Sequence, residues 1–535
     1  MTKLPVFQQE RSEKIQFDNR YQTDASTISS FFIFFIFFIF CLLFLRLFQL
    51  TVVKGNYYYS LAEENRIKEI IIEAARGKII DRKGLVIAKN LPADINKNAN
   101  RLNSPRYYQE GMAAAPIIGY RQSADPADIK NDRCLSKLKI GDKIGKKGVE
   151  KLYDCDLRGR PGKKLIEVDA QGRYLKTLTV VAPTEGKTMQ MALDWQLQQK
   201  AYELLKEKKG AVVAVKPKTG EVLILVSSPT FDPQIFENDN QEAIKKIFAN
   251  QDKPLFNRAG QGVYPPGSIF KLVVAAAALE EKKIDEDTQI EDTGTVQLGP
   301  LTFGNWYFLQ YGKTEGMVDI VKAIRRSNDI FFYKIGEKLG PEKIKRWAER
   351  FGYGKEIGFG LGETTGLIPS PFWKKEVLKE RWYTGDTYNL SIGQGYILVT
   401  PLQVTIATAT IANDGYLCQP QLLKTNRQPP TTNHCKKIPI SPKTLKLIQQ
   451  GMQEACSPGG TGWPLFNFKP QTACKTGTAE SQTKEAAPHA WFTVYAPADN
   501  PEISLTVLVE NGGQGSDVAG PIAKEILKNY FERKE

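Results

Sequence analysis

Two residues three positions apart, Ser268 and Lys271, have side chains that suit nucleophilic acyl transfer. On a helix this spacing places both side chains on one face. A neutral lysine can accept the proton of a serine hydroxyl, and burial favours the neutral form. Pro265, Pro266 and Gly267 mark a helix start, and the apolar residues that follow indicate a buried helix. We therefore predict that Ser268 is a nucleophile and that Lys271 is its base.

A polar triplet, Ser327-Asn328-Asp329, follows further along the chain, directly before an apolar helical segment. In isolation, such a triplet is typical of a helix N-cap. Its position after the Ser-x-x-Lys pair makes Ser327 and Asp329 candidates for catalytic groups as well.

A third group, Lys475-Thr476-Gly477-Thr478, precedes an apolar segment that is typical of a strand. Here Lys475 can hold a substrate carboxylate, and Gly477 lets a peptide backbone lie along an edge strand. Together, in this order, the three groups form the motif set of serine β-lactamases and penicillin-binding proteins.

Further copies of two of these motifs must be weighed against the ordered set. Ser136/Lys139 and Ser481/Lys484 repeat the Ser-x-x-Lys pair, but neither begins a buried helix. The segment 218–220 repeats Lys-Thr-Gly between two apolar stretches, where a hairpin turn is expected. We assign the chemistry to the ordered set alone.

The elements that must position these groups differ between the two ends of the chain. Residues 189–207 resemble a strand end followed by an amphipathic helix, and 210–229 resemble a hairpin. Near the C-terminus, 489–497 and 503–511 are typical of strands, and 521–534 of a helix. This pattern predicts an α+β fold with an antiparallel sheet that mixes both termini, together with a helical lobe.

Composition limits the class of protein. The 535 residues, 41% hydrophobic and 25% charged, predict two or three folded units rather than a disordered chain. The net charge of +14 suits an anionic neighbour such as a membrane surface or an acidic polymer. Only two histidines and no Cys-x-x-Cys pair are present, so we predict neither a metal site nor a cofactor. The seven cysteines do not predict a disulfide framework, although Cys418 and Cys435 could bridge in an oxidising compartment.

An apolar stretch from Phe31 to Val53, interrupted by Arg46, is long enough to cross a bilayer as a helix. No small-residue cleavage site follows it, which favours an uncleaved anchor over a signal peptide. The basic residues of the N-terminal tail predict that this tail is cytoplasmic. The rest of the chain would then lie outside the cytoplasm, which argues against nucleic acid as a partner.

The sequence resembles class B penicillin-binding proteins over nearly its whole length. Residues 61–90, with Arg76-Gly77 and Asp81-Arg82-Lys83-Gly84 at their centre, resemble the family's membrane-proximal signature. Residues 145–173 resemble its second signature, and the segments 385–403 and 489–492 match the catalytic part.

The resemblance implies four segments: a cytoplasmic tail (1–28), a transmembrane anchor (29–53), an elongated pedestal or dimerisation-type domain (54–185) and a transpeptidase domain (186–535). It implies a five-stranded antiparallel sheet flanked by helices in the last of these. The location implied is the inner (cytoplasmic) membrane, with the catalytic domain on the periplasmic side. The basic stretch 121–164 is compatible with either a solvated face or contact with wall or membrane.

The resemblance also implies a reaction, acyl transfer from a stem peptide ending in D-Ala-D-Ala, with possible D,D-carboxypeptidase side activity and inhibition by β-lactams. Ser268 would attack, Lys271 would act as base and Ser327 would relay a proton. Lys475, Thr476 and Thr478 would bind the terminal carboxylate. The backbone N–H groups of Ser268 and Thr478 would form the oxyanion hole.

Asp329 at the end of the triplet, rather than Asn, resembles the elongation type within the family. That type implies a polytopic wall glycosyltransferase and elongation-complex proteins as partners. Some of its members bind zinc through a His and a Cys near this triplet, but Asn328 fills the Cys position here. A division-type transpeptidase, a β-lactamase and a non-catalytic penicillin sensor or scaffold are the alternatives.

Overall fold

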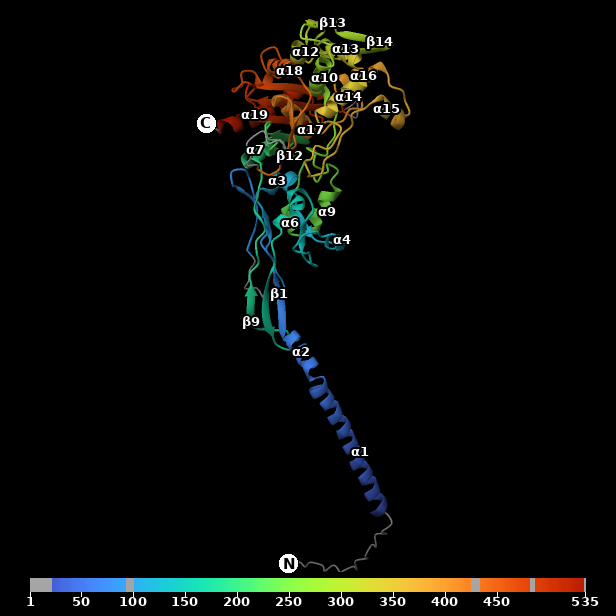
Figure 1. Cartoon of the computed structure of the whole chain (residues 1–535), viewed down its shortest axis with the longest axis vertical. Helices are drawn as coiled ribbons and strands as arrows, with labels where there is room; N and C mark the ends of the chain where they lie inside the picture. The colour runs from blue at the N-terminus through green and yellow to red at the C-terminus, as the bar shows by residue number, and fades with distance from the viewer. Residues whose placement is uncertain (1–21, 93–100, 425–433, 482–485, 534–535) are drawn as a thin grey trace, which may run out of the picture. The chain divides into compact units, whose positions relative to one another are not determined.

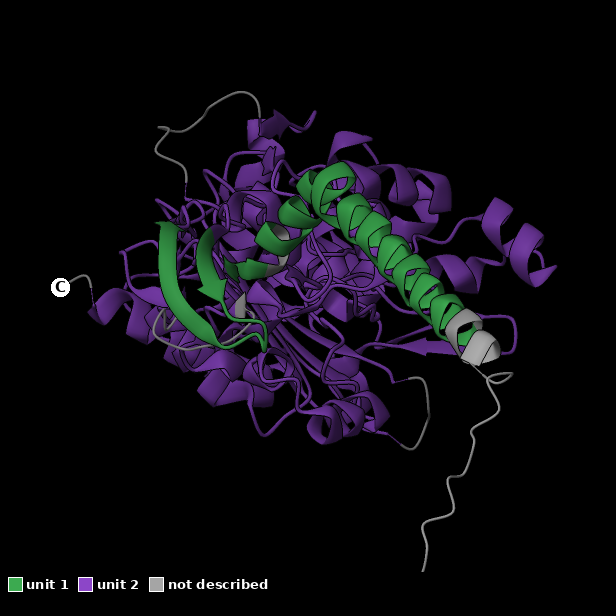
Figure 2. Cartoon of the chain, turned by 90° about the horizontal axis from the view of Figure 1, so that it is seen from below, with its two compact units in different colours: residues 1–71, 96–101, 163–182 green, residues 72–95, 102–162, 183–535 purple. Residues whose placement is uncertain are grey.

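A computed structural model of the chain describes residues 22–92, 101–424, 434–481 and 486–533. The chain divides into two compact units, which Figure 2 shows in different colours. Unit 1 takes in residues 1–71, 96–101 and 163–182, and unit 2 takes in 72–95, 102–162 and 183–535. The segment boundaries expected from the sequence are not tested by this division and stay predictions.

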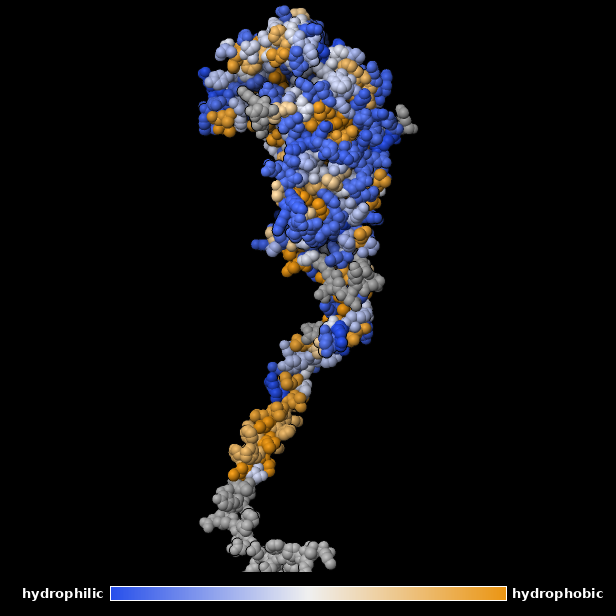
Figure 3. Space-filling model, turned by 180° about the vertical axis from the view of Figure 1, so that it is seen from behind, coloured by the Kyte–Doolittle hydropathy of each residue, from blue (hydrophilic) through white to orange (hydrophobic). Residues whose placement is uncertain are grey.

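Unit 1 begins with a long apolar helix. Helix α1 (Gln22–Phe48) continues through a π turn, η2 (Gln49–Val53), into α2 (Gly55–Arg66). Among the described residues, Ile28–Val53 is the one segment long and apolar enough to cross a membrane, and Figure 3 shows its apolar surface in orange. Its 26 residues span about 39 Å, enough for a hydrocarbon core of about 30 Å. The segment is thus consistent with the predicted single-pass anchor.

A four-stranded sheet completes unit 1, in the order β4-β1-β8-β9. Its strands are β1 (Ile67–Ile72), β4 (Arg101–Leu102), β8 (Gly162–Val168) and β9 (Tyr174–Val181). Strand β9 lies at one edge and is exposed along most of its length. Several of its exposed side chains are apolar: Leu175, Leu178, Val180 and Val181.

The core of unit 2 is a five-stranded antiparallel sheet in the order β12-β11-β21-β20-β19. Its strands are β11 (Gly210–Val215), β12 (Val222–Ser228), β19 (Ala473–Ala479), β20 (His489–Ala496) and β21 (Ile503–Val509). The predicted α+β fold and the mixing of both chain ends in one sheet are therefore confirmed.

Helices cover both faces of this sheet, so its strands are apolar on both sides. Along β11, Val212 packs in the cluster that includes α7 (Trp195–Leu205) and α19 (Gly520–Glu532). Its neighbour Val213 packs in the cluster that includes α17 (Pro401–Ala412). This alternation follows from the two-residue repeat of a strand.

The predicted helical lobe packs around one buried helix, α10 (Lys271–Glu280), and Figure 1 shows its helices gathered together. The other elements of the lobe are η3 (Gly267–Phe270), α12 (Ile320–Arg326), α13 (Asp329–Leu339), α14 (Pro341–Arg350), α16 (Thr384–Ser391) and α18 (Pro442–Ala455). Every residue of α10 from Lys271 to Ala278 is buried, as the uniformly apolar sequence after Lys271 predicts.

The remainder of unit 2 holds most of the residues of the two signatures, while 61–71 and 163–173 belong to unit 1. Its small sheet, in the order β10-β2-β3-β5, comprises β2 (Ile79–Ile80), β3 (Val86–Asn90), β5 (Arg106–Tyr108) and β10 (Met189–Gln190). Glu150, wholly buried, pairs with Arg76 and Arg106, and Arg121 pairs with Glu237. Of the signature residues, Arg76 and Glu150 are thus joined in an internal ion pair.

The cysteine prediction needs correction, because six of the seven cysteines are paired. Besides Cys418–Cys435, which the sequence left open, the structure holds the bridges Cys134–Cys155 and Cys456–Cys474. Partners separated by 17 to 21 residues have no motif that reveals them, since pairing depends on how the intervening chain folds back.

Candidate active site

The predicted nucleophile lies on a helical turn that leads into α10. Gly267–Phe270 form a 3-10 turn and the α-helix begins at Lys271, so Ser268 precedes the α-helix rather than belonging to its first turn. In a 3-10 turn, side chains three positions apart eclipse each other, so Ser268 and Lys271 still share one side. The Ser268 residue is half-buried, whereas Lys271 is 0% exposed.

Lys271 makes three contacts with the polar triplet. Its Nζ donates to Asp329 Oδ1 at 2.6 Å, to the Ser327 carbonyl at 2.8 Å and to Ser327 Oγ at 3.4 Å. Burial lowers the pKa of Lys271, and the Asp329 carboxylate opposes that shift.

Ser327 lies where two helices meet. It ends α12 with a φ of 54°, a left-handed conformation that is uncommon for a residue other than glycine. Asn328 caps α13 by accepting a hydrogen bond from the Phe331 N–H at 2.9 Å. The triplet is therefore both an N-cap and part of the site, since the cap leaves Ser327 and Asp329 turned toward Lys271.

Lys475 approaches the same serine from the sheet. It belongs to β19, the edge strand next to β20, and its Nζ donates to Ser327 Oγ at 2.8 Å and to the Thr476 carbonyl at 3.0 Å. Burial holds the pKa of Lys475 well below its usual range, and the nearby charge of Lys271 lowers it further. One carboxylate, Asp329, therefore faces two buried amines, an arrangement that favours a neutral form for one of them.

The rest of the Lys-Thr-Gly motif lies along the same edge strand. Thr476 Oγ1 donates to Thr461 Oγ1 at 2.9 Å, and Thr478 Oγ1 donates to Gln514 Oε1 at 2.9 Å. A Cβ on Gly477 would lie 3.0 Å from the Pro266 carbonyl oxygen, so the strand packs closely on the turn that carries Ser268.

The backbone of the nucleophile turn also approaches Thr478. A Cβ on Gly267 would lie 2.8 Å from the Thr478 carbonyl oxygen, and Gly267 has a φ of 55°. Gln394 donates to that same carbonyl at 3.3 Å. The structure thus brings the three predicted motifs to one place.

Two residues of the site were missed by sequence reasoning, Asp292 and Asn305. Asn305 Oδ1 accepts the Asp329 N–H at 3.2 Å, and both Asn305 and Asn328 donate to Asp292. Neither residue belongs to a motif, and each reaches the site from a segment that precedes the triplet by more than 20 residues. No pattern in a single sequence reveals them.

The rejected motif copies lie in other surroundings. Ser136 and Lys139 are in an irregular segment without a helix, and 218–220 form the turn between β11 and β12. The expected surroundings of both copies, no buried helix at Ser136 and a hairpin turn at 218–220, are confirmed. Of the third copy, Ser481 is described, while Lys484 lies outside the described residues.

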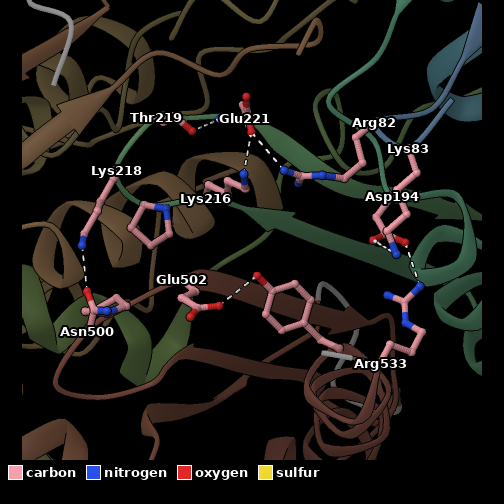
Figure 4. Close-up of a pocket in the computed structure, with 13 residues that line it drawn as sticks. Arg82, Lys83, Asp194, Lys216, Lys218, Thr219, Glu221, Asn500, Glu502 and Arg533 are labelled. Carbon is pink, nitrogen blue, oxygen red and sulfur yellow. Dashed lines mark hydrogen bonds and ion pairs between the residues drawn. The ribbon is translucent and has the colours of Figure 1, made fainter. Parts of the chain in front are cut away.

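A separate cavity of about 580 Å³ lies at that β11–β12 turn (Figure 4). Charged residues dominate its lining: Arg82, Lys83, Asp194, Lys216, Lys218, Glu221, Glu502 and Arg533. None of the predicted site residues lines it. Its two most buried carboxylates each pair with two cations, Glu221 with Lys216 and Arg82, and Asp194 with Lys83 and Arg533.

The zinc that some similar proteins hold near the triplet does not fit the residues present. Among the described residues, no group of three or more His, Cys, Asp or Glu side chains is arranged to hold a metal ion. The side chains that converge before Asp329 are Asp292, Asn305 and Asn328. The amide nitrogens of the two asparagines point at the carboxylate, and an N–H group cannot ligate a cation.

The comparisons with known proteins agree with this geometry. Residues 210–528 match the family model of the penicillin-binding protein transpeptidase domain, and 99–191 match that of the penicillin-binding protein dimerisation domain. The peptidoglycan D,D-transpeptidase MrdA of Salmonella typhimurium is 31% identical, covering 92% of this chain and 93% of its own. That of Escherichia coli strain K12 is 29% identical, covering 91% of each.

Solved structures give the same result. The crystal structure of Pseudomonas aeruginosa PBP2 in complex with WCK 5153 has a TM-score of 0.73 at 32% identity, covering 87% of this chain and 96% of its own. The complex of PBP2 and MreC from Helicobacter pylori has a TM-score of 0.75 at 28% identity, covering 87% and 99%. The chain therefore belongs to the penicillin-binding protein transpeptidases, as a class B member of the elongation type and a serine-type peptidoglycan D,D-transpeptidase.

Proposed function

We propose that Ser268 is the nucleophile through which this chain cross-links stem peptides during cell elongation. The observation that carries the assignment is the connected set Asp329–Lys271–Ser327–Lys475, in which every link is a direct contact of 3.4 Å or less. That set converges beside the turn that presents Ser268.

In the first half-reaction, Ser268 Oγ attacks the carbonyl carbon between the two D-alanines. Lys271 takes the hydroxyl proton, and the departing D-alanine amine receives a proton by way of Ser327, which both lysines contact. The backbone N–H groups of Ser268 and Thr478 stabilise the oxyanion, a role supported by the close approach of Gly267 to Thr478. The products are free D-alanine and an ester on Ser268.

In the second half-reaction, an amine of another stem peptide attacks the ester and takes the acyl group, which regenerates Ser268. Lys475, Thr476 and Thr478 bind the terminal carboxylate of the donor, and Gly477 lets the donor backbone lie along β19. A β-lactam acylates the same serine because its strained amide takes the place of the D-Ala-D-Ala bond.

Covalent labelling by fluorescent penicillin tests the assignment. Ser268→Ala should abolish labelling, whereas Ser136→Ala and Ser481→Ala should label as the unchanged protein does. Full labelling of Ser268→Ala would show that the nucleophile is elsewhere.

We further propose that the catalytic unit lies on the periplasmic side of the inner membrane. Disulfides persist in oxidising compartments, and all six bridged cysteines follow the anchor in the sequence. Protease added to intact spheroplasts should therefore degrade the catalytic unit. Protection of the catalytic unit until the membrane is lysed would contradict this orientation.

The partner we propose is a polytopic wall glycosyltransferase, met through the apolar edge strand β9. Nothing in the chain resembles a glycan polymerase, and relatives have been solved with MreC and in a peptidoglycan synthase complex. Leu178 and Val180 are 43% and 50% exposed on β9, which is the last strand in the sheet order among the described strands of the unit that carries the anchor. Apolar side chains exposed on an edge strand are typical of an interaction surface.

Replacing both residues tests the surface. Leu178→Asp with Val180→Asp should reduce co-purification of the glycosyltransferase and leave penicillin labelling unchanged. The matched control is Leu135→Asp, which changes a side chain that is 93% exposed in unit 2. Equal co-purification of both variants with the partner would exclude β9.

A further inference from the structure

Asp292 is a buried carboxylate to which the mechanism assigns no part. It is 3% exposed, and its two oxygens accept four hydrogen bonds. Oδ1 accepts the Gly294 N–H at 2.9 Å. Oδ2 accepts the Glu315 N–H at 3.0 Å and the side-chain amides of Asn305 at 2.8 Å and Asn328 at 2.9 Å. Each donor is neutral, so a charged oxygen is held in the interior by hydrogen bonds alone.

The orientation of the two asparagine amides is fixed from their other ends. Asn305 Oδ1 accepts the Asp329 N–H at 3.2 Å, and Asn328 Oδ1 accepts the Phe331 N–H at 2.9 Å. A backbone N–H needs an oxygen acceptor, so each amide must present its NH₂ group to Asp292. Asp292, Asn305 and Asn328 are all at most 3% exposed, so no water competes for these bonds.

The cluster of Asp292, Asn305 and Asn328 is connected to Lys271 through Asp329. Asn305 holds the backbone of Asp329, and the neighbouring Trp306 N–H donates to Asp329 Oδ2 at 2.9 Å. Asp329 Oδ1 then accepts from Lys271 at 2.6 Å. Asp292 therefore fixes both sides of Asp329. On one side is the 305–306 segment, in which Asn305 Oδ1 accepts from Asp329 and the Trp306 N–H donates to it, and on the other is Asn328, which caps the helix that Asp329 begins.

We infer that Asp292 is a positioning residue that, through Asn305 and Asn328, aligns Asp329 with Lys271 and does so without a metal ion. The inference rests on the proposed function, because it assumes that Lys271 serves Ser268. Displacing one group by about 1 Å in such an array can cost about 100-fold in rate, which is the scale of effect at stake here.

The variant that tests the inference is Asp292→Asn, which keeps the size of the side chain and removes the charge. The second-order rate constant of penicillin acylation should fall about 10- to 100-fold. The rising limb of its pH dependence should also move to lower pH, because a displaced Asp329 no longer raises the pKa of Lys271.

A purely structural carboxylate provides the control. Asp81 is 0% exposed and accepts the backbone N–H groups of Lys83 and Leu85, both at 2.8 Å, away from the site. Asp81→Asn should lower the melting temperature and leave the pH profile of acylation unchanged. If Asp292→Asn lowers only the melting temperature, with rate and pH profile as in Asp81→Asn, the positioning role is wrong.

The statement that this alignment needs no metal ion is tested separately, on the unchanged full-length protein in detergent. Acylation after dialysis against a chelator should equal that before, and added zinc should not raise it. Loss of acylation on chelation, restored by zinc, would overturn the inference while leaving the Ser268 assignment intact, since Ser268→Ala would still abolish labelling.

Discussion

The two Lys-Thr-Gly segments of unit 2 share three residue types and differ in their surroundings. Lys475 is on β19 with its side chain fully buried, and its Nζ contacts Ser327 Oγ at 2.8 Å. Lys218 is exposed at the β11–β12 turn, and its Nζ donates to Asn500 Oδ1 at 2.7 Å (Figure 4). The sheet order places β12 and β19 at opposite edges, so the two copies belong to different sites.

What separates the copies is burial beside other charges rather than residue type. Burial removes Lys475 from water, and this is the larger cause of its lowered pKa. The nearby buried amine of Lys271 lowers the pKa further. In the turn copy, Lys218 instead remains exposed and its Nζ donates to the neutral side chain of Asn500. The same tripeptide is therefore part of the buried proposed site in one place and a hairpin turn in the other.

The largest effect is expected from replacing the two lysines separately. Lys475→Ala should lower the acylation rate constant about 10²- to 10⁴-fold, because it removes a group that acts on the transferred proton and on the substrate carboxylate. Lys218→Ala should change it less than about twofold, as is usual for a surface residue away from the chemistry. The acylation rate constants of both variants are measured with the same fluorescent penicillin. Similar losses in both variants would contradict the assignment of the two copies to different sites.

Flanking sequence is what allowed the two copies to be told apart before the structure was known. The 218–220 copy lies between two apolar stretches of strand length, and the 475–478 copy precedes another. Those stretches form β11, β12 and β20 as predicted. Local periodicity thus predicted the strands of the sheet. The order of the motifs predicted that Ser327 lies beside Lys271 and Lys475.

Other parts of the site depend on contacts that no local pattern encodes. Asp292 reaches Asn328 across 36 residues, and the positive φ of Ser327 is imposed by the junction of α12 with α13. The bridge Cys456–Cys474 likewise needs α18 and β19 to be packed together first. Such features follow from the tertiary fold, so one sequence without the fold does not show them.

Asp329→Asn tests the electrostatic effect of the Asp329 carboxylate on the two buried lysines of the site, Lys271 and Lys475. The Asp329 carboxylate raises the pKa of both Lys271 and Lys475, so its removal lowers both values further. An amine with a lower pKa becomes neutral at lower pH, and the rising limb of the acylation profile should therefore move to lower pH.

Glu315→Gln is the control for that measurement. Glu315 pairs with Arg326 at 2.6 Å and contacts neither lysine directly, so its loss should leave the position of the limb unchanged. A limb that stays in place in Asp329→Asn, or moves to higher pH, would contradict the electrostatic coupling.

The smallest effect is expected from the disulfide that lies beside each Lys-Thr-Gly copy. Cys474 directly precedes Lys475, and Cys435 Sγ is 3.9 Å from the Lys218 carbonyl oxygen. The two bridges close chain segments of nearly equal length, with separations of 18 and 17 residues. Loop entropy then predicts a similar loss of stability for each, about 3 kcal/mol, when its two cysteines are replaced by alanine.

The two double variants should differ in activity despite that similar loss. Cys474 is wholly buried in β19, so removing its bridge loosens the strand that places Lys475 on Ser327, and acylation should slow about two- to tenfold. Cys418→Ala with Cys435→Ala loosens only the strand pair β17 (Tyr416–Cys418) and β18 (Cys435–Lys437), and acylation should be unchanged. Denaturant unfolding and acylation kinetics on the same samples separate the two effects. If both variants acylate at the original rate, the position of Lys475 does not depend on the bridge, and the packing of β19 against β20 is sufficient to hold it.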